Sequence, residues 1–341
     1  MIHTRNTTAD LPTLVAATLF ALTAAGCDLE SDAIGQRSDA STCPIWACGT
    51  NSAEVNDIPI GELHQFPGEN HGLANSWGAR LAGFRGPGGE DGYTLDMRRG
   101  TLRAVKGAIT LSGAGLIGSI ITIDTGTGDM VDVTVAEFQR VPSWTTSGFW
   151  VDQFVFTAVD PQDGIHRSIC TDATDTSSAS AWAVITSAER YSWADKAVLA
   201  SGAAGLGWNT IACHGNSLYK MKMTGYEADA QINNPHVSDV EARQTTLKMF
   251  TADYCGTGES FTEDGTDLRW YNAAGWADSN DGAITAFEAY WNADGALCLD
   301  TPRLGAAQMA AITAECATVG KVLGPCSSFA GPYVWASEVP L

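Results

Sequence analysis

The sequence predicts a mainly β protein with a C-terminal α+β part. Apolar and polar residues alternate between residues 49 and 201, glycine-rich turns separate these runs, and helical periodicity begins only after residue 202. With 341 residues, 45% hydrophobic and 17% charged, the chain has a globular composition and is long enough for two domains. We therefore expect an antiparallel, β-sandwich-like domain over 49–201 and a disulfide-bridged α+β domain over 202–341.

Two segments illustrate the β pattern. Residues 93–97 alternate apolar and polar side chains, and Arg99-Gly100 then predicts a two-residue hairpin turn into a strand over 101–106. Residues 131–135 carry valines at every second position, again with one apolar and one polar face. Short strands joined by such turns are typical of an antiparallel sheet.

The first helix is predicted by a capping box, in which Ser238 is the N-cap and Glu241 follows three residues later. We expect this helix to end at Cys255-Gly256. Its apolar face is predicted to consist of Val240, Leu247, Phe250 and Tyr254.

A second helix is predicted over 309–319, with Gly320 as a C-cap. Between the two helices, 268–271 and 287–291 are rich in aromatic residues and are predicted to be strands. Helices and strands that alternate in this way define the C-terminal part as α+β.

The N-terminus resembles an export signal. The apolar run over 14–26 is shorter than the about 20 residues that a membrane-spanning helix needs, and it ends in small residues directly before Cys27. We expect 1–26 to be a cleaved signal peptide and Cys27 to carry a lipid that anchors the protein to a membrane of the cell envelope. Residues 27–48 then form a polar linker that ends in a small cysteine loop. Secretion without a lipid is the alternative.

The charge balance limits the choice of partner. The chain has 19 Lys and Arg against 39 Asp and Glu, a net charge of −20. Such an acidic surface repels polyanions, so nucleic acid and anionic lipid headgroups are not expected as main partners.

Nine cysteines are present, and eight remain once Cys27 is set aside. In an oxidising compartment this even number predicts four disulfides, for which 105 pairings exist. No CxxC pair occurs and no cysteine has a histidine at zinc-finger spacing, so the cysteines predict no metal site. No cofactor is expected. As a working set we expect sequential pairing: Cys43–Cys48, Cys170–Cys213, Cys255–Cys298 and Cys316–Cys326.

One acidic segment is a candidate catalytic site. A glycosidase needs two carboxylates that face each other across the bond to be cleaved. Residues 253–267 are dense enough in acidic side chains to supply such a pair, although turns explain several of them equally well. The carboxylates are Asp253, Glu259, Glu263, Asp264 and Asp267.

A second acidic segment, 277–288, partly matches a calcium-binding EF-hand loop. Gly282 fits position 6, Asp281 fits position 5 and Glu288 fits position 12, but Ala277 at position 1 has no ligating side chain. Calcium binding by Asp281 and Glu288 is one interpretation, and a plain β-turn is the favoured one.

Five aromatic residues lie close together in the sequence between the predicted helices. If they were exposed, they would form a sugar-stacking platform or a protein contact. Large aromatic side chains are mostly buried, so we expect them to be core. They are Trp270, Tyr271, Trp276, Tyr290 and Trp291.

The segment Ala252-Asp253-Tyr254-Cys255 resembles the signature of the ADYC domain family of exported bacterial proteins. The residues 258–266, 295–298 and 301–303 follow it in the family's order, as GESFTEDGT, GALC and TPR. The resemblance extends over about 208–303. It implies a disulfide-bearing extracytoplasmic module and assigns no catalytic residue.

These observations favour a non-enzymatic lipoprotein of the bacterial cell envelope that binds an unknown protein or glycan. The alternative is a hydrolase that acts on an extracellular polymer through the carboxylates of 253–267.

Overall fold

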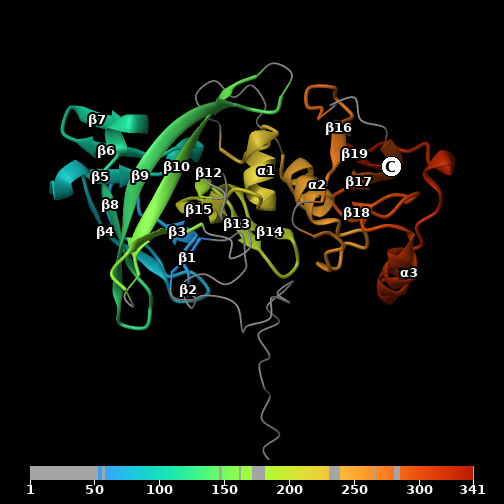
Figure 1. The fold of residues 1–341 in the computed structure, drawn as a ribbon, viewed down its shortest axis with the longest axis horizontal. Coiled ribbons are helices and arrows are strands. Elements are labelled where there is room, and N and C mark those ends of the chain that lie inside the picture. The colour runs from blue at the N-terminus through green and yellow to red at the C-terminus, as the bar shows by residue number, and fades with distance from the viewer. Residues whose placement is uncertain are drawn as a thin grey trace, which may run out of the picture. The chain divides into compact units, whose positions relative to one another are not determined.

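The computed structural model describes residues 53–55, 58–145, 148–160, 163–170, 181–229, 239–263, 266–279 and 285–340 (Figure 1). The predicted signal peptide, Cys27 and the pair Cys43–Cys48 lie outside these residues. The strands are β1 Glu54–Val55, β2 Ile58–Pro59, β3 Glu62–His64, β4 Arg80–Arg85, β5 Thr94–Asp96, β6 Arg103–Lys106, β7 Ile109–Ser112, β8 Ile120–Asp124, β9 Met130–Pro142, β10 Trp150–Val159, β11 His166–Ser168, β12 Trp182–Ser187, β13 Arg190–Ser192, β14 Ala197–Ala200, β15 Trp208–Cys213, β16 Arg269–Asn272, β17 Thr285–Asn292, β18 Gly295–Ala296 and β19 Trp335–Pro340. The α-helices are α1 Ser217–Met223, α2 Val240–Thr251 and α3 Met309–Thr318. The short 3-10 helices are η1 Pro87–Gly89, η2 Arg98–Gly100, η3 Gly113–Leu116, η4 Gly202–Ala204, η5 Ala306–Gln308 and η6 Cys326–Ser328.

The largest sheet has eight antiparallel strands, in the order β3-β15-β12-β10-β9-β8-β4, with β11 paired to β10. Its two end strands, β3 and β4, contact each other, so the sheet curls strongly. Bulges at Leu81/Gly83 in β4 and at Val155/Phe156 in β10 contribute to this curvature, because a bulge bends its strand and increases the local twist. The predicted mainly β fold with antiparallel pairing is confirmed.

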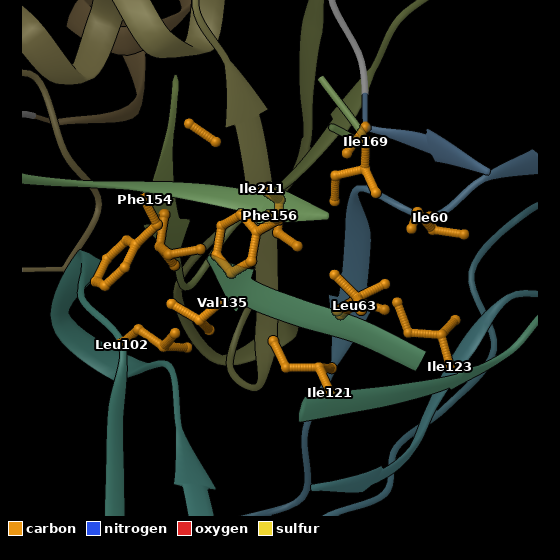
Figure 2. Close-up of a cluster of buried hydrophobic side chains, with 14 of the residues drawn as sticks. Ile60, Leu63, Leu102, Ile121, Ile123, Val135, Phe154, Phe156, Ile169 and Ile211 are labelled. Carbon is orange, nitrogen blue, oxygen red and sulfur yellow. The ribbon is translucent and has the colours of Figure 1, made fainter. Parts of the chain in front are cut away.

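The inside of the curled sheet holds the first hydrophobic core (Figure 2). Phe154 and Phe156 of β10 are fully buried there, and Ile121 and Leu63 reach the same interior from β8 and β3. Strands that are distant in the sequence therefore share one set of apolar contacts.

A second layer covers the outside of this sheet. Helix α1 packs on β12 and β15, α2 packs on α1, and α2 also contacts β17, β18 and β19 of a four-stranded sheet ordered β16-β19-β17-β18. A second core joins Val184 and Ala212 of the first sheet to Leu247 of α2 and Trp291 of β17. The C-terminal α+β part is confirmed. Strand β15 lies after the predicted domain boundary at 201/202 and pairs with β12 and β3 from before it, and the boundary itself stays a prediction.

The predicted hairpin around Arg99-Gly100 is present, but its turn is longer than two residues. Asp96 of β5 pairs with Arg103 of β6, so six residues connect the strands. Arg99 and Gly100 take the positive φ angles of 61° and 59° within that connection. The dipeptide therefore correctly predicted the place of the turn, and positive φ at consecutive residues is typical of tight hairpin turns.

The helix boundaries differ from the predictions. Asp239, not Ser238, caps α2 by accepting a hydrogen bond from the Ala242 N–H at 2.8 Å, and the helix ends at Thr251. Val240 is 47% exposed, so it is not part of the buried face. In the described part of the chain, no helix combines the length and apolar character needed to cross a bilayer.

Candidate functional site

The motif Ala252-Asp253-Tyr254-Cys255 directly follows α2. Ala252 adopts the left-handed conformation, with φ 50° and ψ 40°, and its N–H donates to the carbonyls of Lys248 and Met249. A left-handed residue at this position ends a helix and turns the chain away from the helix axis. The three following side chains are buried and point into different contacts.

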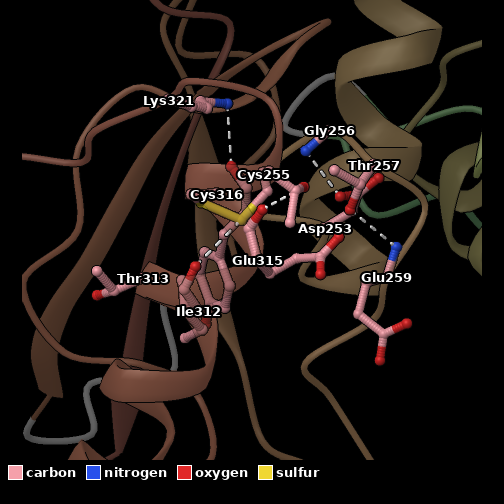
Figure 3. The surroundings of a disulfide bond; sticks show 12 residues. Asp253, Cys255, Gly256, Thr257, Glu259, Ile312, Thr313, Glu315, Cys316 and Lys321 are labelled. Atoms are coloured by element: carbon pink, nitrogen blue, oxygen red, sulfur yellow. Dashed lines mark hydrogen bonds between the residues drawn. A yellow bond between two sulfur atoms is a disulfide. The ribbon is translucent and has the colours of Figure 1, made fainter.

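Asp253 holds the turn after the helix together. Its Oδ2 accepts a hydrogen bond from the Lys248 ammonium at 2.6 Å and another from the Gly258 N–H at 2.9 Å. Its Oδ1 accepts from the Gly256 N–H at 2.8 Å (Figure 3). Lys248 and Asp253 are 4% and 0% exposed, so this is a buried, charge-assisted pair.

Tyr254 belongs to a buried polar cluster with Glu288 and Arg303. The Tyr254 hydroxyl donates to Glu288 Oε1 at 2.6 Å and accepts from the Arg303 N–H at 2.9 Å. The Arg303 guanidinium donates to both carboxylate oxygens of Glu288, each at 3.1 Å. Burial, followed by the negative charge of Glu288, raises the pKa of Tyr254, so the phenol stays protonated.

The Arg303 guanidinium also caps α2. It donates to the carbonyl oxygens of Met249 at 2.9 Å and Phe250 at 3.2 Å. A cation at the C-terminal end of a helix satisfies carbonyls that have no partner within the helix. The motif, the strand β17 and the segment 301–303 are therefore joined at one point.

Cys255 forms a disulfide with Cys316 of α3 (Figure 3). The second C-terminal disulfide joins Cys298 to Cys326. The predicted pairs Cys255–Cys298 and Cys316–Cys326 are therefore wrong. Sequential pairing was expected because Cys316 and Cys326 are close in sequence, but α3 places the Cys316 side chain against the end of α2. The structure joins Cys170 to Cys213, as predicted.

The candidate carboxylates of 253–267 do not share one environment. Asp253 is buried and both of its oxygens accept hydrogen bonds within the protein. Glu259, Glu263 and Asp267 are exposed, and Asp264 lies outside the described residues. Asp253 thus has a structural role, and the arrangement gives no reason to treat it as a general acid or base.

The candidate calcium loop is only partly described, because Asp281 lies outside the described residues. Glu288 is fully buried in β17, where its carboxylate is paired with Arg303. Its position at the β-bulge between Phe287 and Ala289 turns the side chain toward the motif. Within the described ranges, no group of three or more His, Cys, Asp or Glu side chains has an arrangement that fits a metal ion.

The five clustered aromatic residues divide between the two faces of the four-stranded sheet. Trp270 and Trp291 are 6% and 0% exposed and face α2, as expected for core residues. Tyr271 and Tyr290 are half-buried, and both pair with Ala336 of β19, so the tyrosines flank it on the other face. Trp276 is also half-buried. The expectation of a buried core therefore holds for only part of this group.

The aromatic side chains on that other face form a connected cluster. The Tyr290 ring centroid is 4.4 Å from that of Tyr333, 4.7 Å from that of Phe287 and 5.5 Å from that of Phe329. We call the set Tyr271, Phe287, Tyr290, Phe329 and Tyr333 the tyrosine face. All five side chains keep part of their surface open to solvent.

Lys321 is a partly buried lysine that contacts the backbone of the motif. Its ammonium donates to the carbonyls of Tyr254 at 3.0 Å and Asp294 at 2.6 Å. Partial burial lowers the pKa of Lys321 to about 8, although Asp253 and Asp294 oppose this change. The sequence reasoning did not single out this lysine, because nothing in its spacing indicates burial.

We expect the Lys321 amine to react with acetic anhydride with a pH midpoint near 8, measured by mass spectrometry of labelled peptides. Lys106 is the control, because its ion pair with Glu90 raises its pKa above the usual value. The pKa of Lys321 is lower in the folded than in the unfolded protein, because burial disfavours its charged form. Below pH about 8 this burial destabilises the folded protein, and the penalty disappears as pH rises toward about 10.4. Equal midpoints for the two lysines would contradict the burial of Lys321.

Sequence reasoning also missed the partners of the motif. Lys248 stands among apolar residues in Leu247-Lys248-Met249-Phe250, and it precedes Asp253 by five residues. A lysine in an otherwise apolar helix turn is a signal that could have suggested a buried ion pair.

Residues 113–305 match the family model of the ADYC domain. No curated protein matches the chain, and no solved structure matches it. The matched segment covers more than half of the chain and begins earlier than the 208–303 on which the resemblance rested. It includes the β9–β10 hairpin and β12 as well as the motif and its partners Lys248, Glu288 and Arg303, whereas Cys316 lies beyond its end. The chain therefore belongs to the ADYC domain family.

Proposed function

We propose that the protein is a non-enzymatic binding module of the bacterial cell envelope, held at a membrane by a lipid on Cys27. The non-enzymatic role is supported by one observation: the buried charged side chains are paired with one another. In the part of the chain that the structure describes, four ion pairs have both side chains at most 4% exposed, and each joins structural elements or closes a turn. They are Lys222–Glu227, Arg243–Glu189, Lys248–Asp253 and Arg303–Glu288.

Such pairs favour a structural role for the motif. A catalytic acid or base must reach a substrate, whereas each of these carboxylates is in contact with a cation inside the protein. On the opposite face of the four-stranded sheet, the partly exposed side chains of the tyrosine face are aromatic. That combination suits a module that binds a partner without transforming it.

The second half of the proposal concerns location. Three disulfides are consistent with an exported protein, because disulfides persist in oxidising compartments. The apolar run over 14–26 and Cys27 supply the proposed signal peptide and lipid attachment site. The polar segment after Cys27 would connect the lipid to the folded part.

The anchor is tested by intact mass of the protein purified from its native envelope. We expect a mature chain that begins at Cys27 and carries acyl groups, and we expect the protein to enter the detergent phase in a Triton X-114 partition. Cys27→Ala should abolish both results without changing the unfolding midpoint. An unmodified chain that lacks Cys27 would overturn the anchor.

The absence of catalysis is tested separately with dyed polysaccharides and peptidoglycan as substrates. We expect no release of soluble product. Release that is lost in the combined variant Glu259→Gln, Glu263→Gln, Asp267→Asn would show that the exposed carboxylates are catalytic and would contradict the proposal.

A further inference from the structure

We infer that the tyrosine face binds an uncharged glycan, of the class of β-1,4-linked pyranose chains. This inference rests on the proposed function and names the ligand of the binding module. Three observations support it: three tyrosines lie side by side on the sheet, their hydroxyl groups have no partner among the described residues, and the protein is strongly acidic.

The sheet register places the tyrosines together. Tyr271 of β16 and Tyr290 of β17 are both paired with Ala336 of β19, so they stand in one row on either side of a methyl group. Tyr333 joins the row from the segment before β19, with its ring 4.4 Å from that of Tyr290. In addition to partial burial, the nearby Tyr290, Glu338 and Tyr333 raise the pKa of Tyr271 to about 12, in agreement with close packing of these groups.

Within the described part of the chain, the hydroxyl groups of Tyr271, Tyr290 and Tyr333 have no hydrogen-bond partner. A tyrosine offers an apolar ring and a polar end, and a β-linked pyranose has the complementary form, with flat C–H faces and hydroxyls around its edge. Rings and hydroxyls on one surface therefore suit a sugar better than a purely apolar ligand.

Charge excludes the anionic members of the class. Arg269 lies in the neighbouring row of the sheet, but its guanidinium is already paired with Glu338 at 3.2 Å. Glu338 also accepts a hydrogen bond from Thr285. Among its described residues, the face thus offers no unpaired cation to a sulfate, phosphate or uronate, and the net charge of −20 repels a polyanion.

The test is isothermal titration of the mature protein with cellohexaose and with the hexamer of N-acetylglucosamine. We expect saturable binding to at least one of them. The combined variant Tyr271→Ala, Tyr290→Ala, Tyr333→Ala should weaken it at least tenfold, because it removes all three tyrosine rings that would contact the sugar. The same three positions changed to Phe should retain most of the stacking and lose part of the affinity.

Trp150→Ala is the matched control, since Trp150 is 62% exposed and its strand β10 belongs to the eight-stranded sheet rather than to the sheet of the tyrosine face. It should leave the affinity unchanged, and the unfolding midpoint of each variant checks that the fold is retained. No saturable binding to either hexamer would overturn the inference. The inference would also be overturned if sedimentation showed a concentration-dependent dimer that the tyrosine substitutions abolish. The tyrosine face would then be an interface between two copies of the protein.

These outcomes are independent of the anchor. The titration uses the soluble mature chain, so loss of glycan binding leaves the lipid on Cys27 and the lack of catalysis to their own tests. Cleavage of a hexamer during the titration would instead contradict the non-enzymatic proposal.

Discussion

Replacing Glu288 with alanine should destabilise the protein by about 3–5 kcal/mol, because the Arg303 guanidinium would be left buried without its counter-ion. Arg303 is 2% exposed and Glu288 is fully buried, so bulk solvent does not reach the guanidinium in the folded protein. The Tyr254 hydroxyl would lose its acceptor at the same time. Urea unfolding followed by tryptophan fluorescence measures the change, since Trp291 lies on the same strand.

The matched control is an exposed pair of the same chemistry. Arg85 and Asp132 are 38% and 51% exposed, and Arg85→Gln should change stability by no more than about 1 kcal/mol. Glu288→Gln keeps a hydrogen-bond acceptor without the charge and should fall between the two. If Glu288→Ala destabilised the protein no more than Arg85→Gln does, the buried pair would not exist in solution.

A double substitution separates the ion pair from simple packing. Glu288→Leu with Arg303→Met removes both charges, and the cost should be smaller than that of Glu288→Ala, because no unpaired charge remains. The remaining loss would report the capping of α2 by Arg303 through the carbonyls of Met249 and Phe250. A double variant as unstable as the single one would assign the effect to packing alone.

The role of Glu288 also shows where sequence reasoning stopped. The aromatic-rich composition correctly predicted a strand over 287–291, but it does not indicate the bulge at Glu288 or the face that this side chain takes. Period-2 patterning assumes an unbroken register, so it cannot place a residue at a bulge. The same residue was considered as a calcium ligand, since its spacing from Gly282 fits an EF-hand and spacing carries no information about Arg303.

The predicted C-terminal end of α2 was wrong for a related reason. The predicted end of α2 at Cys255-Gly256 relied on glycine as the left-handed residue, but Ala252 takes that conformation in this chain. The contacts of Asp253 and Arg303 hold the turn in place, and they come from tertiary structure. The hairpin turn at Arg99-Gly100 was correctly placed because its signal is local, although the turn is longer than predicted.

For the cysteines, the sequence predicted that disulfides form but did not predict how they pair. The even number of cysteines and the export signal indicated disulfides, and the family signature includes Cys255. Pairing, however, depends on the path of the chain between the cysteines. In the C-terminal part the two bridges interleave, since Cys298 lies between Cys255 and Cys316 in the sequence and Cys326 lies after both. No count or spacing distinguishes this from sequential pairing.

Removing the Cys255–Cys316 bridge should cost about 4 kcal/mol, the second large effect we expect. The bridge closes a segment with a sequence separation of 61, and the loss of chain entropy in the unfolded state grows with that length. The variant Cys255→Ser with Cys316→Ser avoids a free thiol and is measured by the same urea unfolding. The corresponding variant of Cys298 and Cys326, with a separation of 28, should lose somewhat less.

Trypsin offers a direct check of the pairing before any variant is made. Cleavage after Lys248, Arg269, Arg303 and Lys321 puts the four cysteines on separate peptides, 249–269, 270–303, 304–321 and 322–341. Without reduction, we expect 249–269 joined to 304–321, and 270–303 joined to 322–341. Recovery of 249–269 joined to 270–303 would restore sequential pairing. It would also remove the link between α3 and the motif, and with it the reason for the larger loss of stability.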